Sequence, residues 1–188
     1  MRASEACGSL ELESAGATVR GLFRDVEEAI NVASAGQLLP LPGQTMDSSM
    51  LALGAAQKAA TASLTQLTTA ASMGDKDCTG GAVQDFAQAL VALVAHARGL
   101  CATSGDKTLT AKALAATRAI VGESAKVIDE VRTTVIQPTP PNQACGSKEY
   151  GGSAGTVVRA LGSSYPRIYK YIWVFGGIFF YLVVSSCY

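Results

Sequence analysis

Residues able to carry acid–base or nucleophilic chemistry are few, and their spacing forms no recognisable constellation. His96 is the single histidine of the 188-residue chain and lies between two alanines in an apolar stretch. A catalytic histidine needs a carboxylate or a thiol held within hydrogen-bond reach, and no spacing in the sequence ties one to His96. The carboxylate pairs Asp75/Asp77 and Asp129/Glu130 fall in a predicted turn and on a predicted helix surface, where charge is ordinarily solvated. The sequence therefore predicts no catalytic site and a non-enzymatic protein.

Cysteine and glycine spacing argues in the same direction. The five cysteines are far apart and none belongs to a C-x-x-C pair, so neither a zinc site nor a disulfide framework is expected. Scattered free cysteines are typical of a reducing compartment, and no apolar secretory segment opens the chain. The Gly-Gly pairs lack the strand and the lysine or third glycine of a phosphate-binding loop. We expect no metal, no cofactor and a cytoplasmic location. The cysteines are Cys7, Cys78, Cys101, Cys145 and Cys187.

The composition favours closely packed helices. Hydrophobic residues make up 48% of the chain but aromatic residues only 6%. A β-sandwich would be richer in β-branched and aromatic side chains than this mixture of Ala, Leu and Val. Residues 1–136 carry 11 Lys and Arg against 14 Asp and Glu, a net charge of −3, and the remainder carries 4 against 1, a net charge of +3. Neither part has the concentrated basic patch of a nucleic-acid-binding protein, so no nucleic-acid partner is expected.

Residues 83–101 contain the strongest helical pattern. Apolar side chains recur there at steps of three and four, which places them on one continuous seam of a helix. A stripe this broad must be almost enclosed by other helices, with Cys101 packed as a small buried hydrophobe. The seam consists of Val83, Phe86, Leu90, Leu93, Ala97 and Leu100, widened by Val91, Val94 and Cys101.

Three further helices are predicted around this one. Gly36 suits the left-handed position after a helix, Gly74 and Gly105 end the next two, and Asp106 or Thr108 can cap the last. Four helices joined by short polar turns predict an all-α fold, an up-down antiparallel four-helix bundle. The expected elements are a loose lead-in over residues 1–8 and a bundle over residues 9–136, with the sequence DKDCTGG (75–81) as a polar turn and Pro138 ending the last helix.

Hydroxyl side chains interrupt the predicted seams. Thr61, Thr117 and Ser124 occupy seam positions, where a buried hydroxyl must find a backbone carbonyl as its partner. We therefore expect this core to be less stable than a leucine-rich one.

The composition changes after residue 136. Residues 137–164 are rich in Pro, Gly and polar side chains and are predicted to form a linker. Residues 165–188 form a hydrophobic tail, within which residues 168–188 are interrupted by Lys170 alone. As a helix, residues 168–188 would span about 31 Å against a hydrocarbon core of roughly 30 Å. The tail is a borderline membrane span, and it is either a membrane anchor or a non-native terminus.

Three segments resemble the rod domains of the talin family of adhesion proteins. They are LGAAQKAATASLTQLTTAAS (53–72), AVQDFAQALVALVAHARGLCATSGD (82–106) and TAKALAATRAIVGESAKVIDEV (110–131). Talin-rod bundles consist of long Ala-rich helices of this kind, each ending in a short turn such as ATSGD. The resemblance implies a helical bundle that is a fragment or truncated form of a talin-like protein.

The vinculin-binding helices of that family follow the pattern L-x-x-A-A-x-x-V-A-x-x-V-x-x-L-I-x-x-A. The central helix is similar in spacing, with Ala97 smaller than the family's residue and Ser104 in place of its last alanine. The fourth helix matches more weakly, because polar Thr117 and Ser124 fall on its stripe. The resemblance implies that the partner-binding side chains are Phe86, Ala89, Leu90, Leu93, Val94, Ala97, Leu100 and Cys101.

The function implied by the resemblance is that of a cytoskeletal adaptor. In the closed bundle the partner-binding side chains would be core residues, and tension or local unfolding would free their helix to enter a groove on a vinculin-like helical bundle protein. Such a module links adhesion sites indirectly to the actin cytoskeleton, which implies a cytoplasmic location at those sites. The alternative is a tail-anchored membrane protein, held through residues 168–188, with a cytosolic helical interaction domain.

Overall fold

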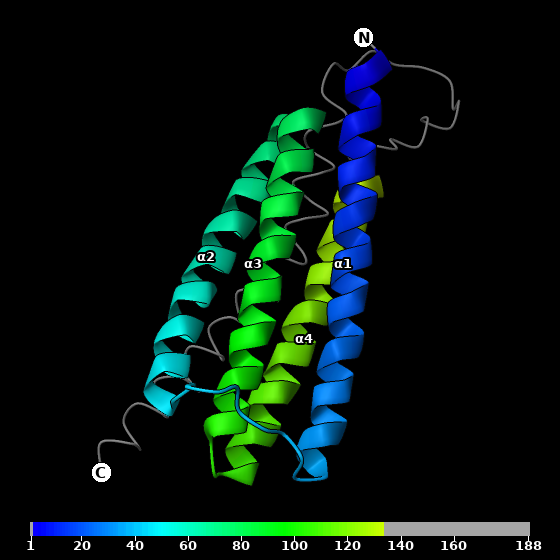
Figure 1. The fold of residues 1–188 in the computed structure, drawn as a ribbon. Coiled ribbons are helices and arrows are strands. Elements are labelled where there is room, and N and C mark those ends of the chain that lie inside the picture. The colour runs from blue at the N-terminus through cyan, green and yellow to red at the C-terminus, as the bar shows by residue number, and fades with distance from the viewer. Residues whose placement is uncertain (1, 134–188) are drawn as a thin grey trace.

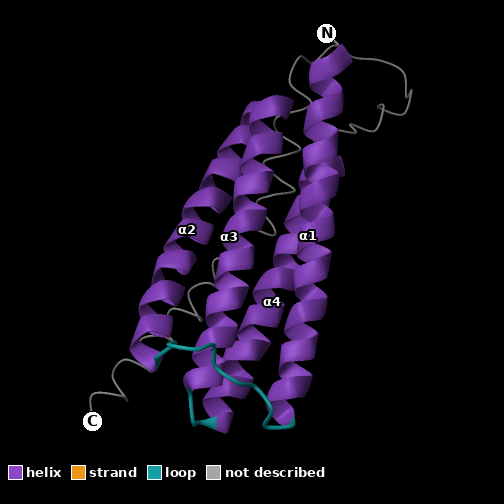
Figure 2. Cartoon of the chain, viewed as in Figure 1, coloured by secondary structure: helices purple, strands orange, loops and turns teal. Residues whose placement is uncertain are grey.

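The computed structural model describes residues 2–133, which form four α-helices. In chain order they are α1 (Arg2–Ser34), α2 (Met46–Met73), α3 (Lys76–Thr103) and α4 (Lys107–Val131). Consecutive helices run in opposite directions (Figure 1), which confirms the predicted all-α, antiparallel fold. Figure 2 shows that loops alone connect these helices. The predicted linker over residues 137–164 and the hydrophobic tail over residues 165–188 lie outside the described residues.

Capping side chains determine where three of the helices begin. Thr45 and Ser48 form a capping box before α2, in which each side-chain oxygen accepts a hydrogen bond from the other residue's backbone N–H at 3.2 and 3.0 Å. Asp75 and Asp106 each accept two backbone N–H groups from the first turns of α3 and α4. Gly74 ends α2 in the left-handed conformation, with φ of 70°. The end of α2 at Gly74 and the start of α4 after Asp106 agree with the sequence prediction.

Two helices begin earlier than predicted. α1 starts at Arg2, so the expected loose lead-in is wrong for residues 2–8, which are helical. Those residues include no proline, and Ala3, Glu5 and Ala6 among them favour a helix. α3 starts at Lys76, so most of the predicted polar turn is helix. Capping by Asp75 at that point outweighs the weak helix propensity of Gly80 and Gly81.

α3 is the central helix of the bundle. It packs along each of the other three helices, whereas α2 packs extensively on α3 alone and α1 packs on α3 and α4. The helices α1 and α2 therefore lie on different sides of α3, although they are consecutive in the chain (Figure 1). As a result, the loop that joins them has to cross α3. The hydrophobic pattern predicts which face of each helix is buried. It does not predict which helices pack against one another, so this arrangement is known from the structure alone.

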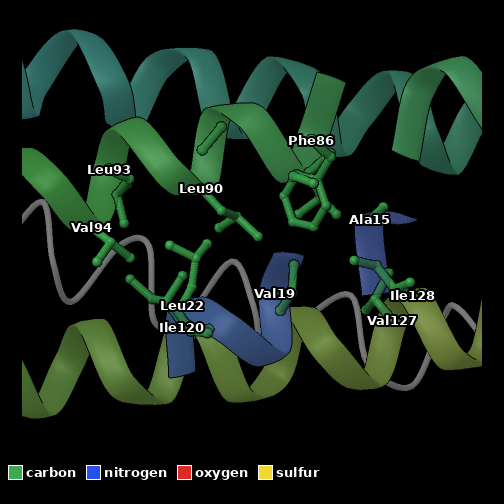
Figure 3. Close-up of a cluster of buried hydrophobic side chains, with 14 of the residues drawn as sticks. Ala15, Val19, Leu22, Phe86, Leu90, Leu93, Val94, Ile120, Val127 and Ile128 are labelled. Atoms are coloured by element: carbon green, nitrogen blue, oxygen red, sulfur yellow. The ribbon is translucent and has the colours of Figure 1, made fainter. Parts of the chain in front are cut away.

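The core is built on the apolar stripe of α3. Phe86, Leu90 and Leu93 are each at most 1% exposed. Their side chains and that of Val94 point toward apolar side chains of α1 and α4 (Figure 3), which are Ala15, Val19 and Leu22 from α1 and Ile120, Val127 and Ile128 from α4. The expectation that other helices enclose the central one is confirmed. Among the described helices, α3 alone is long and apolar enough to cross a membrane, a property that buried core helices share.

Two leucines with opposite exposure test this description of the core. Leu93 is fully buried, and Leu51 on α2 is 76% exposed. Leu93→Ala should lower the free energy of unfolding by about 2–5 kcal/mol, because it removes buried methyl groups and leaves a cavity. Leu51→Ala, the matched control, should change it by no more than about 0.5 kcal/mol. Urea unfolding followed by circular dichroism measures both, and equal effects would contradict the assignment of the core.

Candidate functional site

The eight predicted partner-binding residues all lie on α3. Seven of them are buried, and Ala89 is half-buried. A partner has no access to this stripe while the bundle is folded, because the stripe forms the centre of the core. The seven buried members are Phe86, Leu90, Leu93, Val94, Ala97, Leu100 and Cys101.

Side chains from two helices cover the stripe along its length. Toward the N-terminal end of α3, Phe86 lies opposite Ile128 of α4 (Figure 3). Toward the C-terminal end, Val94 faces Leu22 of α1 and Ile120 of α4 (Figure 3). Since α1 and α4 both contribute to the cover, α3 must separate from both before the whole stripe can meet another protein.

Cys101 closes the C-terminal end of the stripe. Its Sγ donates to the backbone oxygen of Thr110 at 3.9 Å, and Thr110 Oγ1 donates to the backbone oxygen of Cys101 at 3.4 Å. Burial raises the pKa of the Cys101 thiol to about 12, so the thiol is neutral at neutral pH. This placement confirms Cys101 as a small buried hydrophobe and ties the end of α3 to the first turn of α4.

Charged side chains connect α1 to α4. Arg118 Nη2 lies 2.8 Å from Glu27 Oε1, and the guanidinium carbon lies 5.3 Å from the centre of the Phe23 ring. Arg132 Nη2 lies 3.6 Å from Glu13 Oε1. Exposed pairs of this kind each contribute about 1 kcal/mol or less. They join the two helices that frame α3 and do not involve α3 itself.

His96 and Asp75, two of the residues considered above for acid–base chemistry, are both part of the helical framework. His96 is half-buried on α3, and Asp75 is the N-cap of that helix. A hydrogen bond from the backbone N–H of Cys78 is the main reason that the pKa of Asp75 lies below its usual range. Within residues 2–133, no group of three or more His, Cys, Asp or Glu side chains is placed to hold a metal ion.

Buried hydroxyls are the polar feature of the core. Thr117 is fully buried and donates to the backbone oxygen of Ala113 at 2.8 Å, as the sequence predicts. Ser124 is equally buried, and its hydroxyl has no hydrogen-bond partner among the described residues. Ser49 was not predicted as a buried hydroxyl, and it is buried in the same unpartnered way. Its position four residues before Leu53, on the seam of α2, is the signal that could have identified it.

Known proteins similar to this chain are talins. Residues 7–150 match the protein family described as the Talin IBS2B domain. The talin of Oscarella pearsei is 40% identical over 144 residues, which are 76% of this chain. Talin-2 of Homo sapiens is 37% identical over 137 residues (73% of the chain), and Talin-1 of Gallus gallus is 43% identical over 105 residues (56% of the chain). The chain spans 6%, 5% and 4% of the lengths of these three relatives.

Ser124 provides a test of how the core tolerates hydroxyls. Ser124→Ala should raise the free energy of unfolding by about 1 kcal/mol more than Ser14→Ala, because it removes a buried hydroxyl that lacks a partner. Ser14 is an exposed serine within α1, so its variant corrects for the better helix propensity of alanine. Urea unfolding of the two variants measures the difference. A Ser124→Ala variant no more stable than its control would show that the hydroxyl is satisfied in solution.

Proposed function

The chain belongs to the talin IBS2B domain family, and from this premise we propose that α3 is a cryptic helix that binds a vinculin-like helical bundle protein. As a talin IBS2B domain, the chain is a non-enzymatic cytoskeletal adaptor module. The family resemblance given by the three Ala-rich segments is thereby confirmed. Which partner the module binds, and through which residues, is the proposal.

The observation that supports the proposal is the concentration of the partner-binding stripe on one buried helix. All eight predicted partner-binding residues lie on α3, and seven of them are core residues. A helix bound in a groove presents one apolar face along several turns, as α3 does. The same face is occupied by α1 and α4 in the closed bundle, so binding requires that α3 first separates from them.

The separation of α3 from the bundle determines the apparent affinity of the whole domain for its partner. A partner that binds only the released helix binds the whole domain more weakly, by a factor equal to the fraction of molecules in which α3 is free. Tension along the chain raises that fraction, because released α3 permits a longer chain. The unpartnered hydroxyls of Ser49 and Ser124 also raise the fraction of molecules in which α3 is free, because each destabilises the closed bundle.

The location and the wider assembly follow from this proposal. The module would lie in the cytoplasm at adhesion sites, where a vinculin-like partner connects it indirectly to the actin cytoskeleton. The alternative, a tail-anchored membrane protein, depends on residues 168–188, which lie outside the described residues. It stays a prediction, as does the division of the chain into bundle, linker and tail.

A peptide of residues 80–105 tests the proposal directly. It should bind the vinculin head domain, and changing Leu93 and Val94 together to Asp should weaken binding by more than about 100-fold, because two charges would enter an apolar groove. The matched control changes Gln88 and Ala95, which are exposed on the other side of α3, to Asp. That control should bind nearly as tightly as the unmodified peptide.

Fluorescence anisotropy with labelled peptides measures all three affinities. Absence of binding by the unmodified peptide would overturn the proposal. Equal weakening by the two double substitutions would show that charge, and not the apolar stripe, determines the interaction.

A further inference from the structure

The loop between α1 and α2, residues 35–45, crosses α3 on its way from one side of the bundle to the other (Figure 1). It does so because α1 and α2 pack on different sides of α3. Three loop residues, Leu39, Leu41 and Gln44, line a cavity of about 440 Å³ whose other walls come from α1, α3 and α4. The contribution of α3 to these walls comes from its C-terminal half and comprises Val91, Val94, Ala95, Arg98, Gly99 and Ala102.

One side chain of the loop, that of Gln44, makes a close contact with α3. The amide group of Gln44 lies directly against Gly99, so that a Cβ added at Gly99 would collide with it. Gln44 also fixes the shape of the loop through two hydrogen bonds with Leu41. The side-chain Oε1 of Gln44 accepts from the backbone N–H of Leu41 at 3.2 Å, and the backbone N–H of Gln44 donates to the backbone oxygen of Leu41 at 3.0 Å. Pro40 and Pro42 restrict the remaining backbone.

We propose that the loop over residues 35–45 is a strap that holds the C-terminal half of α3 in the closed bundle, with Gln44 seated against Gly99 as its anchor. The strapped half contains Val94 and Leu100 of the partner-binding stripe, whereas Phe86 precedes it. Leu38, near the start of the strap, packs against the buried cluster that contains Cys101 and Leu114, whereas the space beneath Leu39, Leu41 and Gln44 is a cavity, so Gln44 is the contact that holds this later part of the strap on α3. Loss of one anchor therefore loosens the strap.

The strap regulates the access of a partner protein to the partner-binding stripe, and this part of the inference rests on the proposed function. Its effect on α3 is nevertheless a property of the folded chain alone. α3 can move out past the strap only after Gln44 leaves Gly99, so release of the C-terminal half is gated separately from release of the N-terminal half. Partner binding is then sensitive to a loop that contributes no residue to the partner-binding stripe.

Hydrogen exchange in the full chain tests the strap without any partner. Gln44→Ala should speed amide exchange over residues 91–103 by about fivefold to tenfold and leave residues 79–90 unchanged, because it removes the contact with Gly99 and the Leu41–Gln44 hydrogen bond that shapes the loop over that half of the helix. Gln37→Ala is the matched control, since Gln37 is an exposed glutamine of the same loop. Equal exchange in the two variants, or equal acceleration in both halves of α3, would overturn the proposal.

A second pair of variants approaches the contact from α3. Gly99→Ala should displace the Gln44 amide and speed exchange over residues 91–103, although alanine favours a helix more than glycine does. Gly81→Ala on the same helix meets no atom within 4 Å and should therefore stabilise α3. If Gly99→Ala stabilised the chain as Gly81→Ala does, the contact would have no restraining role.

Titration with the vinculin head domain separates the strap from the proposed function. The peptide of residues 80–105 lacks the strap, so its affinity reports on the function alone. Gln44→Ala should raise the affinity of the full chain by the same factor as it speeds exchange. Failure of the peptide to bind would refute the function and leave the exchange result intact, whereas a binding peptide with unchanged exchange in Gln44→Ala would refute the strap.

Discussion

Burial of one apolar stripe on α3 is the interaction on which the rest of this structure depends. α1 and α4 cover the stripe, α2 packs along α3 with its buried side chains in the same core cluster, and the loop between α1 and α2 crosses α3. The proposed partner site uses the same side chains. Since Phe86 or Leu93 cannot lie in the core and in a partner's groove at once, closing of the bundle and binding compete for one surface.

The surroundings of α3 set the balance of that competition. A fully buried Leu or Phe side chain contributes about 1.5–3 kcal/mol, so release of several such residues opposes binding strongly. Unpartnered Ser124 and the cavity of about 440 Å³ under the strap work in the opposite direction, because each leaves the closed state less than optimally packed. The exposed Arg118–Glu27 pair joins α1 to α4 and adds about 1 kcal/mol or less to the stability of the frame around α3.

Local signals allowed much of the fold to be predicted from the sequence. The three-and-four spacing of apolar residues identified the buried face of α3, and Gly74 and Asp106 marked helix ends through short-range hydrogen bonds. The first turns of α3 were missed, because glycine-rich composition suggested a turn where Asp75 provides a cap. The spacing of apolar residues identifies the buried face of a helix, but it does not identify the element that packs against that face. The packing of α2 on α3 alone and the contact of Gln44 with Gly99 could therefore not be predicted.

The competition between core and partner can be measured as a single ratio. The affinity of the vinculin head domain for the full chain, divided by its affinity for the peptide of residues 80–105, should equal the equilibrium constant for α3 opening obtained from hydrogen exchange in the free chain. Agreement between the two numbers is the result that the account predicts. A full chain that bound as tightly as the peptide while the amides of α3 stayed protected would contradict it, because binding would then use a surface of the closed bundle.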